Sequence, residues 1–211
     1  MKIGQAFVAS AAICVGLLGS SAALAQEATA PGVHEHDGFM LRLAIGGGYG
    51  QSSTTVLNES WAISGPGSLF SLALGGRVTD SLIIHGEMYG ATLFSPKFKI
   101  GGQTFEAIGD TSLTMAGLGP GVTYYFMPIN LYASATIAAS FLSLQHGGAS
   151  GSAKPGFGTN IMVGKEWWVS DNWGIGLAGQ FLFQKNSDTG PGADISWTSL
   201  GGGLAFSATY N

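Results

Sequence analysis

The strongest constraint on this chain is an alternation of apolar residues with period two, which recurs along most of its length. In "SLFSLALGGRVTDSLIIHGEMYG", residues 68–90, apolar residues fall at every second position on both sides of a central Thr-Asp dipeptide. Side chains of a β-strand point alternately to opposite faces, so this spacing predicts two strands joined by a tight turn. The other face carries Arg77, His85 and Glu87. The pattern alone does not say whether the apolar face lines a core or meets lipid.

The same pattern predicts eight antiparallel strands, arranged as an up-and-down meander. They are expected at about residues 39–50, 69–78, 82–91, 112–126, 131–141, 158–169, 173–184 and 196–210. The apolar parity changes within the fourth strand, as a bulge near Gly117 would allow. Connections after the second, fourth and sixth strands are short, whereas the others span about ten to twenty residues. This alternation of short and long connections is typical of a meander standing in a membrane.

Composition indicates which face is outside. Charged residues make up 9% of the 211-residue chain, which contains 35 glycines. After the N-terminal segment, no run of 18 apolar residues offers a membrane helix. The non-apolar face is mostly Gly, Ala, Ser and Thr, which suits a narrow interior better than a solvent surface. The sequence therefore predicts an all-β, transmembrane β-barrel whose apolar face meets lipid. A soluble periplasmic barrel of lipocalin type is the alternative fold.

The N-terminus has the pattern of an export signal. A basic Lys2, an apolar stretch and small residues ending in Ala25 predict a signal peptide over residues 1–25. We expect a periplasmic tail over residues 26–37 and the barrel over residues 38–211. The only cysteine, Cys14, lies in the signal peptide, so we expect no disulfide in the mature chain.

Aromatic residues cluster near the predicted strand ends. Tyr and Trp are enriched at the two interfaces of a membrane, and barrels carry such girdles. The residues expected in the girdles include Tyr49, Trp167, Trp168, Trp173 and Tyr210.

The segment "GKEWWVSDNWGIGLAGQF", residues 164–181, together with "VTDSL", resembles the small bacterial outer-membrane barrels. That superfamily includes the transmembrane domain of outer-membrane protein A and the outer-membrane protein X-like proteins, and the likeness covers roughly residues 38–211. It implies eight strands, an integral position in the outer membrane of a Gram-negative bacterium, periplasmic short turns and four long outer loops. It also implies contact with outer-membrane lipids and, during biogenesis, with the barrel assembly machinery. Such proteins usually end in an aromatic residue, whereas here Tyr210 stands one position early.

Four polar residues are predicted to face the interior of the first three strands. Glu87 is expected to pair with Arg42 or Arg77, and His85 to join the network, because buried charges require partners. One interpretation is an interior network that locks the barrel. The other is a gate or a proton-linked pore, and the many small interior residues leave room for a small ligand.

The segment "SPKFKIGGQTF", residues 95–105, predicts a hairpin beyond the membrane. Lys97 and Lys99 alternate with Phe98, and Gly101-Gly102 forms a good two-residue turn. The lysines would suit lipopolysaccharide phosphates, and the hairpin edge could pair with an extracellular partner strand. A solvated hairpin without a partner is the simpler interpretation.

The sequence offers weak signals for chemistry. The "HEHD" at residues 34–37 could hold a divalent metal, and His146 lies near serines in its loop, as in a lipid A-modifying enzyme. Neither forms a convincing constellation. We therefore expect no catalytic residue, metal, cofactor or nucleic-acid partner. The predicted function is a non-enzymatic structural or surface-interaction role, with a narrow pore or ligand-binding barrel, and a lipid-modifying enzyme, as alternatives.

Overall fold

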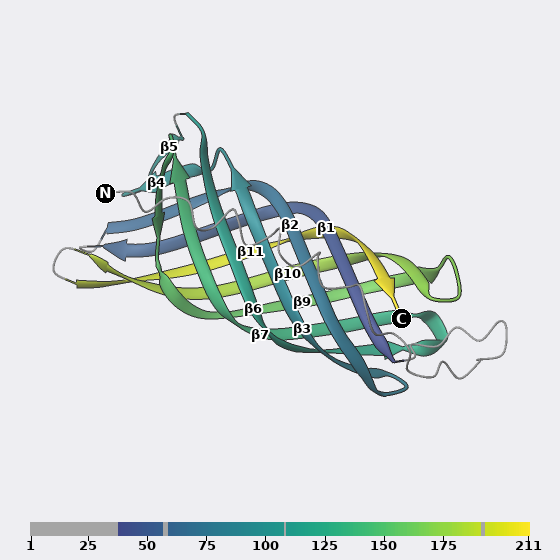
Figure 1. Ribbon diagram of the computed structural model, residues 1–211. Coiled ribbons are helices and arrows are strands. Elements are labelled where there is room, and N and C mark those ends of the chain that lie inside the picture. Colours follow the sequence, from purple (N-terminus) through teal and green to yellow (C-terminus); the bar gives the residue numbers. More distant parts are fainter. Residues whose placement is uncertain (1–37, 57–58, 108, 191–192) are drawn as a thin grey trace. The chain divides into compact units, whose positions relative to one another are not determined.

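The computed structural model describes residues 38–56, 59–107, 109–190 and 193–211 (Figure 1). Its framework is a closed ring of 8 antiparallel strands. These strands are β1 (Phe39–Val56), β2 (Glu59–Thr79), β3 (Leu82–Phe94), β6 (Thr111–Phe126), β7 (Leu131–His146), β9 (Lys154–Trp168), β10 (Trp173–Gly190) and β11 (Ala193–Tyr210). The shorter elements are β4 (Lys97–Ile100), β5 (Gln103–Glu106), β8 (Ala149–Ser152) and the 3-10 helix η1 (Met127–Ile129). The predicted eight-stranded antiparallel barrel is confirmed.

Ring closure joins the first strand to the last. The order is β1-β11-β10-β9-β7-β6-β3-β2, and β2 pairs with β1 again. The β1–β11 pairing runs from Leu41 opposite Tyr210 to Ser53 opposite Thr198. A closed ring pairs its backbone groups between strands, which is what a chain needs in order to cross a bilayer with β-structure.

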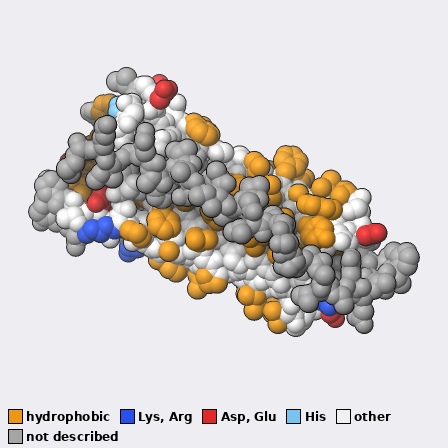
Figure 2. Space-filling model, in the orientation of Figure 1, with side chains coloured by type: hydrophobic (Ala, Val, Ile, Leu, Met, Phe, Trp, Pro, Cys, Tyr) orange, Lys and Arg blue, Asp and Glu red, His pale blue; other side chains and the backbone are white. Residues whose placement is uncertain are grey.

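The outer wall of the ring is apolar. Side chains alternate between buried and exposed along each strand, as in β7, where Tyr132 is buried and Ile137 is 59% exposed. Leu204 and Phe206 are the extreme cases, each 74% exposed. Figure 2 shows hydrophobic side chains spread over the visible wall. An apolar outside around a more polar inside is the pattern of a barrel surrounded by lipid.

The two ends of the barrel differ, and we name them by their connections. The turn end holds the short connections from β2 to β3, from β6 to β7 through η1, and from β9 to β10. At the opposite, ribbon end, paired strands continue as antiparallel ribbons. The β1–β2 pairing reaches Val56 opposite Glu59, and the β10–β11 pairing reaches Gly190 opposite Ala193. Much of the sequence expected to form long loops is therefore strand.

The fourth ring strand, β6, contains no bulge. Its pairing with β3 is unbroken from Leu82 opposite Tyr124 to Phe94 opposite Ser112, so the predicted bulge near Gly117 is wrong. Leu113 and Met115 point into the barrel and are buried, whereas the apolar residues nearer the turn end point outward. The apparent change of parity arises because these two inward-facing side chains of β6 are themselves apolar.

The hairpin between β3 and β6 extends the ring wall along β2, beyond the end of β3. β4 pairs with β5 and also with β2, from Trp61 opposite Ile100 to Ser64 opposite Lys97. Its turn is made by Gly101 and Gly102, whose φ angles of +56° and +88° suit a type I′ turn. The predicted hairpin exists, but its first strand lies beside β2. Among the described residues, helices long and apolar enough to cross a membrane are absent.

Candidate functional site: the barrel interior and its walls

The middle of the barrel interior is organised around the buried carboxylate of Glu87. Its Oε1 accepts hydrogen bonds from Ser71 Oγ at 2.5 Å and from Asn160 Nδ2 at 2.9 Å. Its Oε2 accepts a hydrogen bond from the Thr136 hydroxyl. Gln180 Nε2 donates to Asn160 Oδ1 at 3.1 Å, which extends the network to β10. The network therefore joins strands from opposite sides of the ring.

A second polar layer lies nearer the turn end. Arg42 is 0% exposed, and its Nη2 donates to Thr123 Oγ1 at 3.2 Å and to Ser134 Oγ at 2.9 Å. His85 Nε2 lies 3.0 Å from the same Thr123 hydroxyl and 3.3 Å from Ser134 Oγ. The guanidinium also stands over the Tyr132 ring, 4.5 Å from its centroid. Two hydroxyls thus connect the arginine with the histidine.

The charged groups predicted for the interior are arranged differently from a direct ion-pair network. Within the described part of the chain, Arg42 and Glu87 form no ion pair, and each is bonded to neutral side chains. Arg77 lies elsewhere, at the turn end of β2, where its Nη1 is 3.2 Å from Asp80 Oδ1. Its side chain is 30% exposed, because the strand ends within a few residues and lets it reach the turn.

One buried carboxylate, Glu166, was missed by sequence reasoning. Its Oε1 accepts a hydrogen bond from Thr209 Oγ1 at 2.6 Å, and its Oε2 accepts one from Tyr125 Oη at 3.2 Å. Its parity matches that of Asn160 and Met162, which also point inward on β9. This parity could have identified Glu166 as an inward-facing residue from the sequence. The adjacent charged residue, Lys165, lies on the opposite face and made the alternation harder to recognise.

An apolar cluster fills part of the interior toward the ribbon end, beside the buried polar side chains of Ser52, Gln184 and Asn186. The buried cluster there is Ile63, Leu69, Tyr89, Ala91, Leu93, Leu113, Met115, Ala138, Leu142 and Leu182. Tyr89 forms the boundary between this cluster and the polar layers. Its ring lies against Gly117, and a Cβ atom at Gly158 would stand 2.6 Å from its hydroxyl oxygen. The two glycines therefore make room for the ring across the interior.

The aromatic residues expected in the girdles divide between two faces. Tyr49 is exposed toward the ribbon end, and its hydroxyl donates to Ser64 Oγ at 3.1 Å. Trp167 and Trp173 are exposed at the turn end, where Trp173 meets Tyr210 edge to face with centroids 5.4 Å apart. Trp168 is directly opposite the inward-facing Gly174. It therefore lies on the inner face at the mouth of the barrel.

The remaining sequence candidates are dispersed. Lys97 and Lys99 are exposed on β4, whereas Phe98 between them packs against the buried apolar cluster. His146 Nδ1 lies 2.8 Å from Thr111 Oγ1. Residues 34–37 lie outside the described residues, as do the predicted signal peptide and tail. Across the described ranges, no group of three or more His, Cys, Asp or Glu side chains is placed to hold a metal ion.

Comparison with known proteins supports the architecture. No protein-family model and no curated protein matches the chain. Among solved structures, Neisserial surface protein A, from Neisseria, is 14% identical, and the match covers 82% of this chain and 96% of that one at a TM-score of 0.53. The outer-membrane protein OprG from Pseudomonas aeruginosa is 11% identical over 84% of this chain and 98% of that one, with a TM-score of 0.50.

At these identities the likeness shows the fold alone. The ring of 8 strands, its apolar outer wall and these similar structures define the class: the fold is that of the small eight-stranded outer-membrane β-barrels. The predicted resemblance is confirmed at this level. The lipid-facing wall is that of an integral membrane barrel, and similar structures such as OprG are outer-membrane proteins, in agreement with the predicted location.

Proposed function

We propose that the protein is a non-enzymatic barrel with a closed interior, serving a structural or surface-interaction role in the outer membrane. The observation that carries the proposal is the filled ribbon end of the interior. Leu93, Leu113 and Leu182, with Tyr89 beneath them, are each exposed by 2% or less. An eight-stranded barrel is just wide enough for its side chains to fill, so these buried side chains support a closed interior.

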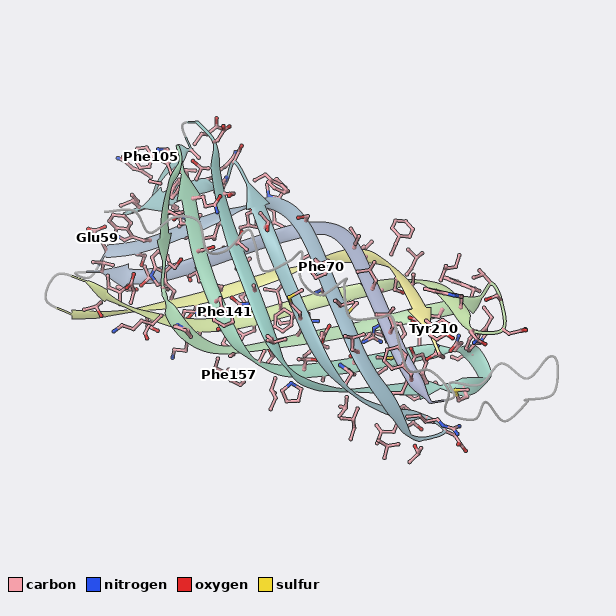
Figure 3. The ribbon with its side chains drawn as sticks, viewed as in Figure 1. Glu59, Phe70, Phe105, Phe141, Phe157 and Tyr210 are labelled. Carbon is pink, nitrogen blue, oxygen red and sulfur yellow. The ribbon has the colours of Figure 1, made fainter. Side chains whose placement is uncertain are left out.

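The parts available for interaction are the ribbons beyond the apolar wall. They extend the β1–β2 and β10–β11 pairs, and they add the β4–β5 hairpin, whose Phe105 is 49% exposed. Figure 3 labels Glu59 and Phe105 in this region, away from Tyr210 at the turn end. A rigid barrel that presents ribbons on one side of the membrane suits contact with neighbouring envelope components.

A narrow pore is the alternative that a specific observation favours. The polar half of the interior, with Arg42, His85 and Glu87 bonded to hydroxyl and amide groups, resembles the lining of a selective passage. In this alternative, the apolar cluster would have to move to let a solute through.

The deciding experiment combines a gel shift with conductance. Outer membranes from cells expressing the full-length protein are run unboiled and boiled on a denaturing gel, and the purified barrel is then placed in a planar bilayer. We expect a band that shifts on boiling and no single-channel current. A steady current that changes in Glu87→Gln would contradict the closed interior and favour the pore. A protein found in the soluble periplasm without a shift would overturn the membrane assignment.

The non-enzymatic part has its own test. Lipid A from cells overexpressing the protein is compared by mass spectrometry with lipid A from cells carrying an empty vector. We expect identical acylation patterns. A changed pattern that is lost in His146→Ala would make the protein a lipid-modifying enzyme instead.

A further inference from the structure

One stripe of the outer wall combines a hollow, a pair of hydroxyls and two lysines. Their order matches that of the acyl chain, the linkage group and the phosphate of a lipid. On β3 the outward-facing residues toward the ribbon end are Met88, Gly90, Thr92 and Phe94. The chain then turns at Ser95-Pro96 into β4. We call this series, with the outward-facing residues of β4, the outer stripe.

The lower part of the outer stripe is a hollow of about 200 Å³ in the lipid-facing wall. Gly90 and Ala116 leave its floor without large side chains, and Phe70 and Met88 border it. Phe70 is labelled on the barrel wall in Figure 3. The dimensions and apolar borders suit a segment of an acyl chain, and the hollow is continuous with the apolar wall that lipid already covers.

Ser68, Thr92 and Thr114 contribute to the lining of the same hollow, mostly through their apolar atoms. The Thr92 and Thr114 Oγ1 atoms lie 3.3 Å apart, within hydrogen-bond distance of each other. These polar side chains lie on the outward face, below the aromatic Phe94. This is where the ester or amide linkage of a lipid, which accepts hydrogen bonds, would come to rest if its chain lay in the hollow.

Two ammonium groups complete the outer stripe. Lys97 and Lys99 are opposite Ser64 and Ala62 of β2, whose side chains lie on the outward face, and Phe98 between them packs inward. The lysines therefore stand on the same outer wall as Thr92, farther from the turn end. A Lys near a membrane surface attracts anionic headgroups, and the effect adds over several residues.

An acidic side chain partly neutralises the positive charge of these lysines. Lys97 Nζ lies 3.6 Å from Glu106 Oε1, in a pair whose side chains are 60% and 84% exposed. An exposed pair of this kind is weak, so a phosphate can compete for the lysine. Lys99 makes no ion pair or hydrogen bond with any described residue.

We propose that the outer stripe is a docking site for one molecule of lipid A, with an acyl chain in the hollow, a linkage carbonyl or chain hydroxyl at the Thr92–Thr114 pair, and a phosphate at Lys97 and Lys99. This rests on the proposed function, with the orientation expected from the sequence, in which the short turns are periplasmic and the ribbon end lies on the lipopolysaccharide side of the outer membrane. Lipid A fits better than an ordinary phospholipid because it combines phosphates, several chains and polar groups near the chain linkages.

The test measures lipid retained by the purified full-length barrel. The protein is reconstituted into phosphatidylcholine vesicles containing either lipid A or phosphatidylglycerol at equal phosphate, extracted in mild detergent, and examined by native mass spectrometry. We expect the Lys97→Ala/Lys99→Ala variant to retain lipid A about tenfold less well. The matched control, Lys154→Ala/Lys185→Ala, removes two exposed lysines from β9 and β10 and should leave retention unchanged.

Two further variants test the other parts of the stripe. Ala116→Leu fills the hollow and should lower lipid A retention several-fold, whereas Ala139→Leu, at an outward-facing alanine of β7, should not. Glu106→Gln releases Lys97 and should raise retention roughly twofold to fivefold.

The outcomes are separable from those of the proposed function. Unchanged lipid A retention in the lysine variant would overturn the docking site, even if the gel band of the barrel still shifts on boiling and the barrel carries no current in a planar bilayer. An equal loss of lipid A and phosphatidylglycerol would replace lipid A by anionic phospholipid. If the barrel conducts current while lipid A retention responds to the variants as expected, the closed interior is overturned and the docking site stands.

Discussion

The Glu87 carboxylate ties β3 to two strands, β7 and β9, with which β3 does not pair. It belongs to β3, yet its hydrogen bonds reach Thr136 on β7 and Asn160 on β9, across the interior. Ser71 on β2 completes the set. A buried carboxylate surrounded by such donors is held in one position, and the donors lose their partners together if it is removed.

We therefore expect Glu87→Leu to lower the free energy of unfolding by about 3 kcal/mol, because three buried donors are left without an acceptor. The measurement is urea-induced unfolding in lipid vesicles, followed by the gel shift between folded and unfolded bands. The control is Glu106→Leu on the hairpin, an exposed carboxylate at which the change should be within about 0.5 kcal/mol. Equal effects at both positions would mean that the interior network does not stabilise the barrel.

The β4–β5 hairpin shows how an element outside the ring is fastened to it. Phe98 packs against the buried cluster, whereas Phe105, its direct cross-strand neighbour, is exposed. Directly opposite residues share one face of an antiparallel pair, so the difference lies between the two strands. β4, which pairs with β2, contributes contacts to the barrel, whereas β5 at the outer edge of the hairpin contributes fewer.

This asymmetry predicts different costs for the same truncation. Phe98→Ala should destabilise the barrel by about 1–2 kcal/mol through lost packing, and Phe105→Ala by less than about 0.5 kcal/mol. Urea unfolding of the two variants in parallel gives the comparison. A larger cost for Phe105→Ala would show that β5, and not β4, carries the packing of the hairpin against the barrel.

The eight ring strands could be predicted from the sequence because a lipid-facing wall imposes apolar residues at every second position. The pattern fails where that physics changes. At Leu113 and Met115 the interior is apolar too, so parity no longer distinguishes the faces. Beyond Tyr49, β1 and β2 leave the apolar wall and become rich in Ser, Thr and Gly, so their pairing to Val56 left no apolar alternation to detect. The pairing of β4 with β2 is a tertiary contact that the local pattern does not encode.

For the whole barrel, the orientation of its apolar face decides how it responds to new charges. Along β11, the outward-facing residues run from Tyr210 at the turn end through Phe206 and Leu204 to Thr198. Leu204 lies near the middle of this series, at the depth where the surroundings are most apolar. Thr198 lies at its polar margin.

Leu204→Arg should therefore lower the stability of the barrel in vesicles by about 2–4 kcal/mol, and Thr198→Arg by about 0–1 kcal/mol. Both residues lie on the same strand and the same face, so the difference reports depth in the bilayer. Reversible urea unfolding in vesicles measures it. Similar costs at the two sites would contradict a lipid-facing wall.

The pairing between β1 and β11 also determines when the ring can close during biogenesis. The edge of the first strand meets its partner only in the last strand, with Leu41 opposite Tyr210. A chain still being made or still in transit therefore has nothing to close against, and its exposed strand edge invites pairing with other chains. Closure of the ring must wait until β11 has been synthesised, so a chain interrupted before β11 would yield an aggregation-prone fragment instead of a smaller barrel.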